Sequence, residues 1–457
     1  MFTCTRTIAL LSLSTALLSG APQEDSNEPN ALQAHLENQV ESAMEENDLE
    51  GMIVVIGLGD ETLMERGWGR LPGGHIADPQ QLVRAQALVE PLTAIAALQL
   101  VGQGKLSLDQ PVHSILEDLK WEEGEVQIHH LLAQTSGLIG WDAALPPHER
   151  DAATVASLLE LVKGQGLEAK PGTCFQYSES NALVLGAIIE KVSGAPLSEW
   201  ITKHILEPAD AESSGFGLED APPTRKGSIG SREIGGESIS VPEGVHPFGE
   251  DEFCTTALDL LRLRRALSDG LILEEDQLEA LTEMKRLEDG TPTGYGFGVN
   301  RTRVGDHGGI SIGGAAEGMS MHMAHYADPD ITVIVMAADE VAPVGTIERN
   351  LTRLVLDLPL PGISDLELPP DQAARCVGAY QLGCTTLSID LEKSGHLTLS
   401  SSDRSTEKLL YQGQYRFVSS RDPELEVEFV VVEGEKLAGH MILKEHGRHT
   451  EAVRFPR

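Results

Sequence analysis

The chain has 457 residues, of which 41% are hydrophobic, so it is long enough for two or three domains with sizeable cores. Its formal net charge of -37 excludes nucleic acid as a partner, because binding to phosphate backbones is driven by basic patches. The acidic residues are spread along the chain instead of forming one tail. That distribution is typical of a solvated, self-repelling surface and indicates no particular substrate.

The N-terminus has the pattern of an export signal. One Arg precedes an apolar run from Thr7 to Leu18, and the small residues Ser19, Gly20 and Ala21 follow it. The run has about a dozen residues, whereas a membrane-spanning helix needs roughly 20. We therefore expect residues 1–21 to be a signal peptide, residues 22–29 to be a linker, and the mature protein to be periplasmic or secreted, without a membrane span.

Removal of the signal peptide would leave four cysteines in an oxidising compartment. These are Cys174, Cys254, Cys376 and Cys384. Four cysteines allow three connectivities, and buried free thiols are an equal alternative. Cys376 and Cys384 are close enough in sequence for a bridge within a hairpin. Because no histidine accompanies them at ligand spacing, we expect no metal site there. We also expect no cofactor.

In chain order, the first predicted element is a surface helix in residues 31–47, where apolar residues recur at helical spacing. Residues 51–71 form apolar or alternating runs on both sides of Gly59-Asp60, which predicts a β-hairpin. From about residue 82 to residue 206 the periodicity is helical and is interrupted by Gly and Pro. This segment predicts an all-helical insert.

The insert begins with an amphipathic helix predicted over Val83–Val101. Residues 213–250 are rich in Gly, Ser, Pro and charge, which predicts a long surface loop. Two apolar strands are expected on either side of residues 327–330, followed by a closing helix. Strands before and after the insert would then pair in one sheet.

A Pro-rich segment near residues 360–370 is the clearest linker in the chain. Beyond it, polar and apolar residues alternate at period two, which predicts a small antiparallel β domain. The expected organisation is an α+β domain over residues 30–362, with a cleft between its two layers, and a β-barrel-like domain over residues 363–457.

Four segments occur in the order and spacing of a known family's landmarks. They are "LQLVGQGKLSLDQPV", "VQIHHLLAQTSGL", "PGTCFQYSESNALVLGAIIEKVSG" and "GDHGGIS". Together they resemble the β-lactamase and penicillin-binding-protein-like serine hydrolases, particularly the class C and esterase-like branch. The resemblance covers roughly residues 30–360 and implies an antiparallel sheet flanked by helices with an all-helical subdomain. The β tail resembles the lipocalin-like domain that often follows.

The resemblance implies a Ser and, one helical turn later, a Lys at the start of the first long helix, because the amine must reach the hydroxyl. In this chain these two positions hold Ala87 and Glu90. Alanine has no nucleophile, and glutamate reverses the charge that would keep a neighbouring base deprotonated. We therefore predict that serine acyl transfer is lost.

The family's Tyr-x-Asn landmark reads Tyr177-Ser178-Glu179 in this chain. The tyrosine is retained, but beside Glu90 and Glu179 its pKa is expected to rise, which would make Tyr177 a poor base. The third landmark, His-x-Gly on an inner strand, matches His307-Gly308-Gly309. Gly309 would keep the strand edge open to a ligand.

The family's oxyanion hole would use the backbone N–H groups of Ala87 and Ile310, which survive the loss of side chains. Glu90 would disfavour an anionic ligand there. Two like charges about 4 Å apart repel by on the order of 4 kcal/mol at an effective dielectric constant near 20. An ion pair between Glu90 and a protonated His307 is the compensating hypothesis.

Two functional classes remain open. The first is a non-catalytic protein that binds a small-molecule or peptide ligand, or a partner, in the old cleft or on the β tail. The alternative is an esterase-like or amidase-like hydrolase with altered chemistry. In that case Tyr177, Glu90, Glu179 and His307 would supply acid, base or metal contacts. The sequence does not indicate an oligomeric state.

Other serines could also supply a nucleophile. Ser311 lies in a Gly-x-Ser-x-Gly match and is followed by Asp330 and His396, the chain order of α/β-hydrolases. A serine of the 213–250 loop is a further option. Ser405-Thr406-Glu407-Lys408 spells Ser-x-x-Lys, but its polar surroundings predict a solvated turn.

Overall fold

The computed structural model describes residues 31–145, 153–217, 231–234, 237–240, 253–316, 318–382, 384–401, 404–422, 424–432, 436–445 and 448–455. The predicted signal peptide and linker lie outside these residues, so both stay predictions. Among the helices that are described, none has the length and apolar character needed to cross a membrane.

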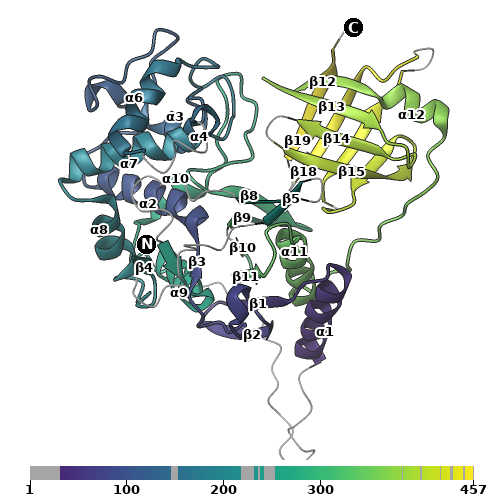
Figure 1. The fold of residues 1–457 in the computed structure, drawn as a ribbon, viewed down its shortest axis with the longest axis horizontal. Helices are drawn as coiled ribbons and strands as arrows, with labels where there is room; N and C mark the ends of the chain where they lie inside the picture. Colours follow the sequence, from purple (N-terminus) through teal and green to yellow (C-terminus); the bar gives the residue numbers. More distant parts are fainter. Residues whose placement is uncertain are drawn as a thin grey trace, which may run out of the picture.

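A six-stranded antiparallel sheet forms the centre of the first domain, with the strand order β2-β1-β11-β10-β9-β8 (Figure 1). Its strands are β1 (Gly51–Leu58), β2 (Glu61–Gly69), β8 (Asn300–Val304), β9 (His307–Ala316), β10 (Met319–Tyr326) and β11 (Ile331–Ala337). β1 pairs with β11, and Val54 lies opposite Val335. Strands from both sides of the helical insert therefore meet in one sheet, as the sequence predicted.

Each face of the sheet has its own hydrophobic core. On one face, α1 (Ala31–Glu46) and α11 (Val344–Val355) cover side chains such as Val54. On the other, α2 (Val89–Gly102) and α9 (Ala257–Ser268) cover side chains such as Ile53. Burial on both faces explains why β1 and β11 are almost continuously apolar instead of alternating.

Short helices form the helical part beside this sheet, and all of them except α10 lie within the predicted insert. They are α3 (Ile128–Leu132), α4 (Trp141–Ala144), α6 (Val155–Gln165), α7 (Glu179–Ser193), α8 (Leu197–Ile201) and α10 (Glu275–Thr282). Single turns also occur at η1 (Pro72–Gly74), η3 (Val112–Ser114) and η4 (Thr202–Leu206). α2 packs against α7, α8 and α10, so it connects this part with the sheet.

The first long helix begins later than the sequence predicted. Residues Val83–Arg84 form the short strand β3, which pairs with β7 (Phe253–Thr255), and Gln86–Leu88 form the 3-10 turn η2. Helix α2 then starts at Val89, with Pro91 in its first turn, where a missing N–H breaks no helical hydrogen bond. Apolar periodicity alone did not reveal the strand, because its pairing partner is about 170 residues away.

The predicted 213–250 loop contains more regular structure than expected. β4 (Gly215–Phe216) pairs with β7, and β5 (Ser231–Ile234) pairs with β6 (Glu237–Ser240) in a hairpin. The rest of this predicted loop lies outside the described residues, except for residues 213, 214 and 217.

The second domain is a closed antiparallel barrel of eight strands, as expected of the β tail. Its strands are β12 (Gly378–Leu382), β13 (Thr385–Leu391), β14 (Leu397–Ser401), β15 (Arg404–Gly413), β16 (Arg416–Ser419), β17 (Glu426–Val430), β18 (His440–Glu445) and β19 (Arg448–Arg454). An unpredicted helix, α12 (Pro370–Cys376), precedes them. The Ser405–Lys408 segment lies within β15 and not in the turn that the sequence suggested.

Aromatic side chains fill the barrel. The ring of Phe417 lies 5.2 Å from that of Tyr411 and 5.5 Å from that of Phe429. Phe417, Phe429 and Tyr380 are all less than 4% exposed. The interior is therefore a packed core, as in other small barrels whose side chains fill the inside.

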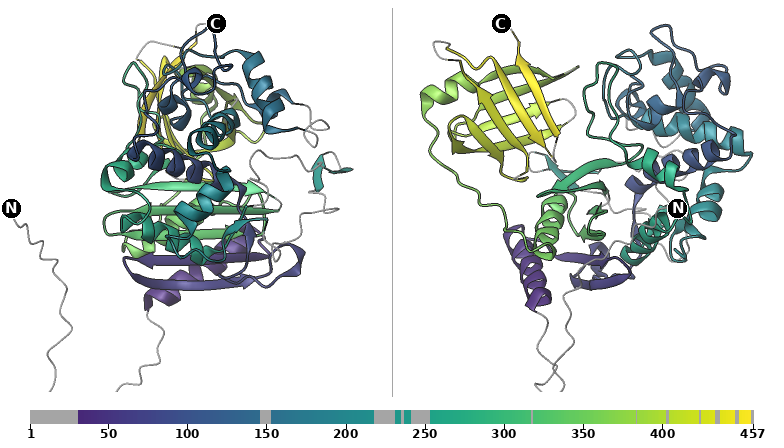
Figure 2. Two further views of the ribbon diagram at one scale, coloured as in Figure 1. Left: turned by 90° about the vertical axis from the view of Figure 1, so that its left-hand side faces the viewer. Right: turned by 180° about the vertical axis from the view of Figure 1, so that it is seen from behind.

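The barrel stands beside the helical part, and both lie beyond the β8 edge of the central sheet (Figures 1 and 2). A disulfide joins Cys174, in the loop before α7, to Cys384, between β12 and β13. Cys254 and Cys376 are buried and are not part of this disulfide. The bridge within a hairpin that sequence spacing suggested for Cys376 is thus not formed, because the fold brings Cys384 to a residue 210 positions away.

Ion pairs also link the barrel to α11. Arg349 lies 2.7 Å from Asp422, and Arg353 forms an ion pair with Glu424. All four side chains are at most 20% exposed. The turn between β16 and β17 therefore docks on α11, while the disulfide holds the barrel at the helical part.

Candidate functional site

Ala87 lies in η2, immediately before α2, and faces strand β9. A Cβ atom added at Gly314 would overlap the Cβ atom of Ala87, so the turn and the strand approach as closely as a glycine permits. The cavity that Ala87 lines with Gly314 and Ala315 has a volume of about 20 Å³. That is room for roughly one water molecule. The position that the resemblance assigns to the family's nucleophile therefore has little free space around its methyl group.

Glu90 is held by neutral hydrogen-bond donors. Its Oε1 atom accepts a hydrogen bond from Gln134 Nε2 at 2.7 Å and one from the Tyr295 hydroxyl at 2.9 Å. Burial raises the pKa of Glu90, although hydrogen bonds from Tyr177, Gln134 and Tyr295 act in the opposite direction. The position that the resemblance assigns to the family's lysine therefore holds a carboxyl group whose pKa is raised by burial.

The Tyr-x-Asn position lies beside this carboxyl group. Tyr177 is 51% exposed, and its hydroxyl is among the hydrogen-bonding groups that lower the pKa of Glu90. Ser178 is the N-cap of α7, and Glu179 is the first residue of that helix. The structure thus brings Ala87, Glu90 and Tyr177 together. The predicted rise in the pKa of Tyr177 stays a prediction.

Gln134, which the sequence analysis did not single out, connects Glu90 to α7. Its φ angle of 58° is left-handed, a conformation that residues other than glycine seldom adopt. Its Oε1 atom accepts hydrogen bonds from the backbone N–H of Ser178 at 3.0 Å and from Asn181 Nδ2 at 2.5 Å. Such backbone conformations cluster at functional sites. Gln134 lies within the landmark segment "VQIHHLLAQTSGL", but the resemblance assigned no role to this position.

Tyr295 was also missed, although the segment "GYGFGV" carries a usable signal. Gly298 in that segment has φ 73°, and a Cβ atom added there would lie 2.8 Å from the Cβ atom of Ala94 in α2. Only glycine fits such an approach, so the segment lies directly on α2. This placement brings the Tyr295 hydroxyl to Glu90. The Tyr295 ring also lies 5.5 Å from the ring of Phe175.

His307 lies far from this group. It is the first residue of β9, whereas Gly314, which contacts Ala87, is the eighth. Seven residues of strand span about 23 Å. The Nδ1 atom of His307 instead lies 2.7 Å from the backbone oxygen of Asp328. The hypothetical ion pair between Glu90 and His307 is therefore not formed.

In the same register, Ile310 lies too far from Ala87 to form the predicted oxyanion hole with it. Ile310 is four strand residues, about 13 Å, from Gly314, and Gly309 is farther still. Ala315 lines the small cavity with Ala87 and is the strand residue whose backbone could face that turn. The motif indicated the strand correctly, but a motif does not determine which strand residue meets a distant turn.

The proposed Ser311 nucleophile faces away from η2. Ser311 pairs with Ala324, a member of the core beneath α11. His396 Nε2 lies 3.0 Å from Asp365 on the barrel side of the linker. The structure therefore does not bring Ser311, Asp330 and His396 together. The described ranges contain no group of three or more His, Cys, Asp and Glu residues placed to hold a metal ion.

Comparisons with known proteins identify the family. The family model described as Beta-lactamase matches residues 36–357. Penicillin-binding protein 4* of Bacillus subtilis is 25% identical over 448 residues, which cover 92% of this chain and 98% of that protein. Esterase EstB of Burkholderia gladioli is 28% identical over 204 residues. That match covers 41% of this chain and only 52% of the esterase.

A solved structure, the octameric penicillin-binding protein homologue from Pyrococcus abyssi, has the same overall fold. It aligns with a TM-score of 0.63 at 20% identity and covers 92% of this chain and 99% of that one. The family model spans the first domain from α1 to the end of α11. The chain therefore belongs to the beta-lactamase family.

Proposed function

We propose that this chain has lost serine acyl transfer and binds a small-molecule or peptide ligand, or a partner, in place of catalysis. The observation that carries the proposal is the contact of Ala87 with Gly314 around a cavity of about 20 Å³. A methyl group cannot attack a carbonyl carbon. The space beside it is also too small for the acyl group of a substrate.

Glu90 supports the same proposal. A serine nucleophile needs a neighbouring base that takes its proton. The carboxyl group of Glu90 instead accepts hydrogen bonds from Gln134 and Tyr295, and burial raises its pKa. It acts as an acceptor that joins α2 to two neighbouring segments.

The proposal is tested by covalent labelling of the purified protein with a fluorophosphonate probe and, separately, with a β-lactam. Intact-mass measurement should show no adduct. The matched control is the double variant Ala87→Ser with Glu90→Lys in the same chain. Labelling of the variant alone would indicate that the rest of the site still works. An adduct on any serine of the unmodified protein would refute the proposal.

A hydrolase with altered chemistry is the second candidate, and the raised pKa of Glu90 favours it. A carboxyl group with a raised pKa beside an exposed phenol, Tyr177, has the properties of a general acid. Relatives in the family include a protein named as an esterase. Turnover of an ester panel that Glu90→Gln abolishes would favour this candidate, whereas an inert protein would reject it.

We also propose that the protein is exported. The apolar run Thr7–Leu18 supports export, as does the disulfide between Cys174 and Cys384, since such bonds persist in oxidising compartments. Cell fractionation followed by N-terminal sequencing should find a mature chain that begins near residue 22. A chain that retains residue 1 in the cytoplasmic fraction would contradict export.

A further inference from the structure

A cavity of about 430 Å³ lies where the barrel meets the first domain. Its walls include Phe175 from the loop before α7, Arg301 and Arg303 from β8, Arg349 from α11 and Glu445 from β18. Pockets for small molecules have volumes of about 300–1,000 Å³. The cavity is therefore large enough for a ligand, unlike the space beside Ala87.

Two of its three arginines already have carboxylate partners. Arg349 lies 2.7 Å from Asp422, and Arg303 lies 3.3 Å from Asp306. Arg301 is the remaining guanidinium of this cavity, and the described residues give it no carboxylate partner.

Arg301 is half-buried and forms no ion pair within the described residues. Its Nη1 atom donates a hydrogen bond to the backbone oxygen of Thr282 at 2.8 Å. Burial lowers the pKa of Arg301, and no neighbouring charge contributes to that shift. Buried charges are normally paired. The chain has 71 acidic and 34 basic residues, so an unpaired arginine in a cavity is unexpected here.

An apolar wall lies in the same cavity. Phe175 and Met284 line it. The Phe175 ring contacts Tyr295, whose hydroxyl reaches Glu90, so the cavity adjoins the family's catalytic position. Phe175 also follows Cys174 directly, and the disulfide to the barrel therefore anchors this wall.

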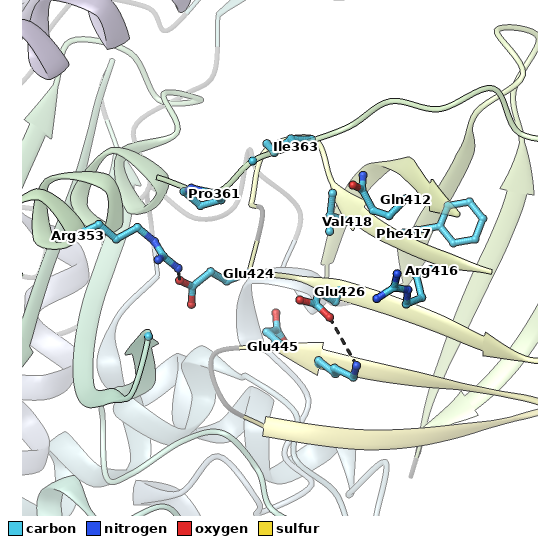
Figure 3. A pocket seen from close by; sticks show the side chains of 13 residues that line it. Arg353, Pro361, Ile363, Gln412, Arg416, Phe417, Val418, Glu424, Glu426 and Glu445 are labelled. Atoms are coloured by element: carbon cyan, nitrogen blue, oxygen red, sulfur yellow. Dashed lines mark hydrogen bonds and ion pairs between the residues drawn. The ribbon is translucent and has the colours of Figure 1, made fainter. Parts of the chain in front are cut away.

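A second cavity between the domains, of about 550 Å³, provides a contrast. Figure 3 shows its lining, in which Arg353 points to Glu424. Lys444 in the same lining lies 3.6 Å from Glu426. Both of these cations are paired with carboxylates, and the third cation of the lining, Arg416, is exposed to solvent. Among the described residues this cavity therefore has no half-buried arginine without a carboxylate partner, unlike the smaller one.

We propose that the 430 Å³ cavity binds a carboxylate ligand that carries an apolar group and has the size of an N-acylated amino acid. Arg301 holds the carboxylate, and Phe175 contacts the apolar group. A guanidinium matches a carboxylate with two parallel hydrogen bonds. The inference rests on the proposed function, because it names the ligand class of a protein that binds without acyl transfer.

Isothermal titration calorimetry of the full, oxidised chain with N-acetyl-phenylalanine, as both enantiomers, tests the inference. The uncharged probe is N-acetyl-phenylalanine amide. The acid should bind at least about ten-fold more tightly than the amide. Arg301→Gln should remove that preference, and Phe175→Ala should weaken both probes. Arg66→Gln, on β2 at the opposite edge of the sheet, is the matched control and should bind like the unmodified chain.

Equal affinity for acid and amide, no binding of either, or an unchanged preference in Arg301→Gln would overturn the inference. Phe175→Ala keeps the test informative if Arg301→Gln does not fold. The labelling experiment is independent of these measurements. An unlabelled protein that binds no acid contradicts the ligand class alone, whereas a labelled serine contradicts the proposed function.

Discussion

Glu90 and Glu348 carry two desolvated carboxyl groups on opposite faces of the same sheet. Each accepts a hydrogen bond from a tyrosine hydroxyl, Tyr295 at 2.9 Å for Glu90 and Tyr326 at 3.2 Å for Glu348. Burial raises the pKa of both, that of Glu348 to about 7. They differ in the charges that surround them.

Glu348 has basic neighbours. Arg349 lowers its pKa, and His322 Nε2 lies 3.7 Å from its Oε2 atom. Arg349 in turn pairs with Asp422 of the barrel, so Glu348 belongs to the charged contact between the domains. Glu90 has only neutral donors among its hydrogen-bond partners. Glu348 therefore lies among charged groups, whereas Glu90 lies among uncharged hydrogen-bond donors.

The largest expected effect is that of Glu348→Ala. The substitution leaves the hydroxyls of Tyr326 and Thr352 without their buried acceptor. Removing one partner from a buried charged network costs about 3–5 kcal/mol of the free energy of unfolding. Urea unfolding measures the loss. Glu348→Gln, which keeps an acceptor, should lose less stability. A loss below about 1 kcal/mol in Glu348→Ala would contradict the role of Glu348 as the buried acceptor of these hydroxyls.

The pH dependence of stability should also reveal Glu348. Its folded pKa of about 7 lies above the ordinary value of 4.5. Between these pH values the folded state binds more protons than the unfolded state, so stability falls as pH rises. The decrease contributed by this group is about 3 kcal/mol at 1.36 kcal/mol per pKa unit. Glu348→Gln should flatten the curve between about pH 4.5 and 7, and an unchanged curve would show that another group titrates.

A smaller effect is expected where η2 meets β9. Gly314→Ala adds a methyl group that overlaps Ala87, and overpacking of this kind costs about 1–3 kcal/mol. Gly308→Ala is the matched control on the same strand, because its added Cβ atom would meet only Arg301 Nη2, at 3.8 Å. Thermal unfolding compares the two variants. Equal midpoints would mean that β9 does not approach the turn in this register.

Glu90→Gln should have the smallest effect. The amide keeps an oxygen that accepts from Gln134 and Tyr295, so the free energy of unfolding at pH 5 should change by less than about 1 kcal/mol. Because burial raises the pKa of Glu90, its ionisation disfavours the folded state as pH rises. Relative to the unmodified chain, the variant should therefore be more stable at pH 8 than at pH 5. A relative loss at pH 8 would indicate a stabilising charge at Glu90.

Much of the fold was predictable because its signals are local. β1 and β11 are continuously apolar because both faces of the sheet are buried. The barrel strands alternate because only one of their faces is buried. The absence of a serine and a lysine at Ala87 and Glu90 could likewise be read from the residues. The order of the landmark segments along the chain was sufficient to identify the family.

The register of β9 could not be read in the same way. Whether His307 or Gly314 meets η2 depends on how a strand and a turn more than 200 residues apart align, and no local pattern encodes that alignment. Gln134 and Tyr295 reach Glu90 for the same reason, through three segments that only packing brings together.

The sequence by itself therefore determined most of the elements, which residues stand where the resemblance places the nucleophile and the lysine, and that a β domain follows. The tertiary structure decided what surrounds Glu90, that Cys174 pairs with Cys384, and that Arg301 lies in a cavity beside the barrel. The physical reason is that element type follows from local spacing and burial, whereas each of these contacts joins residues distant in the chain.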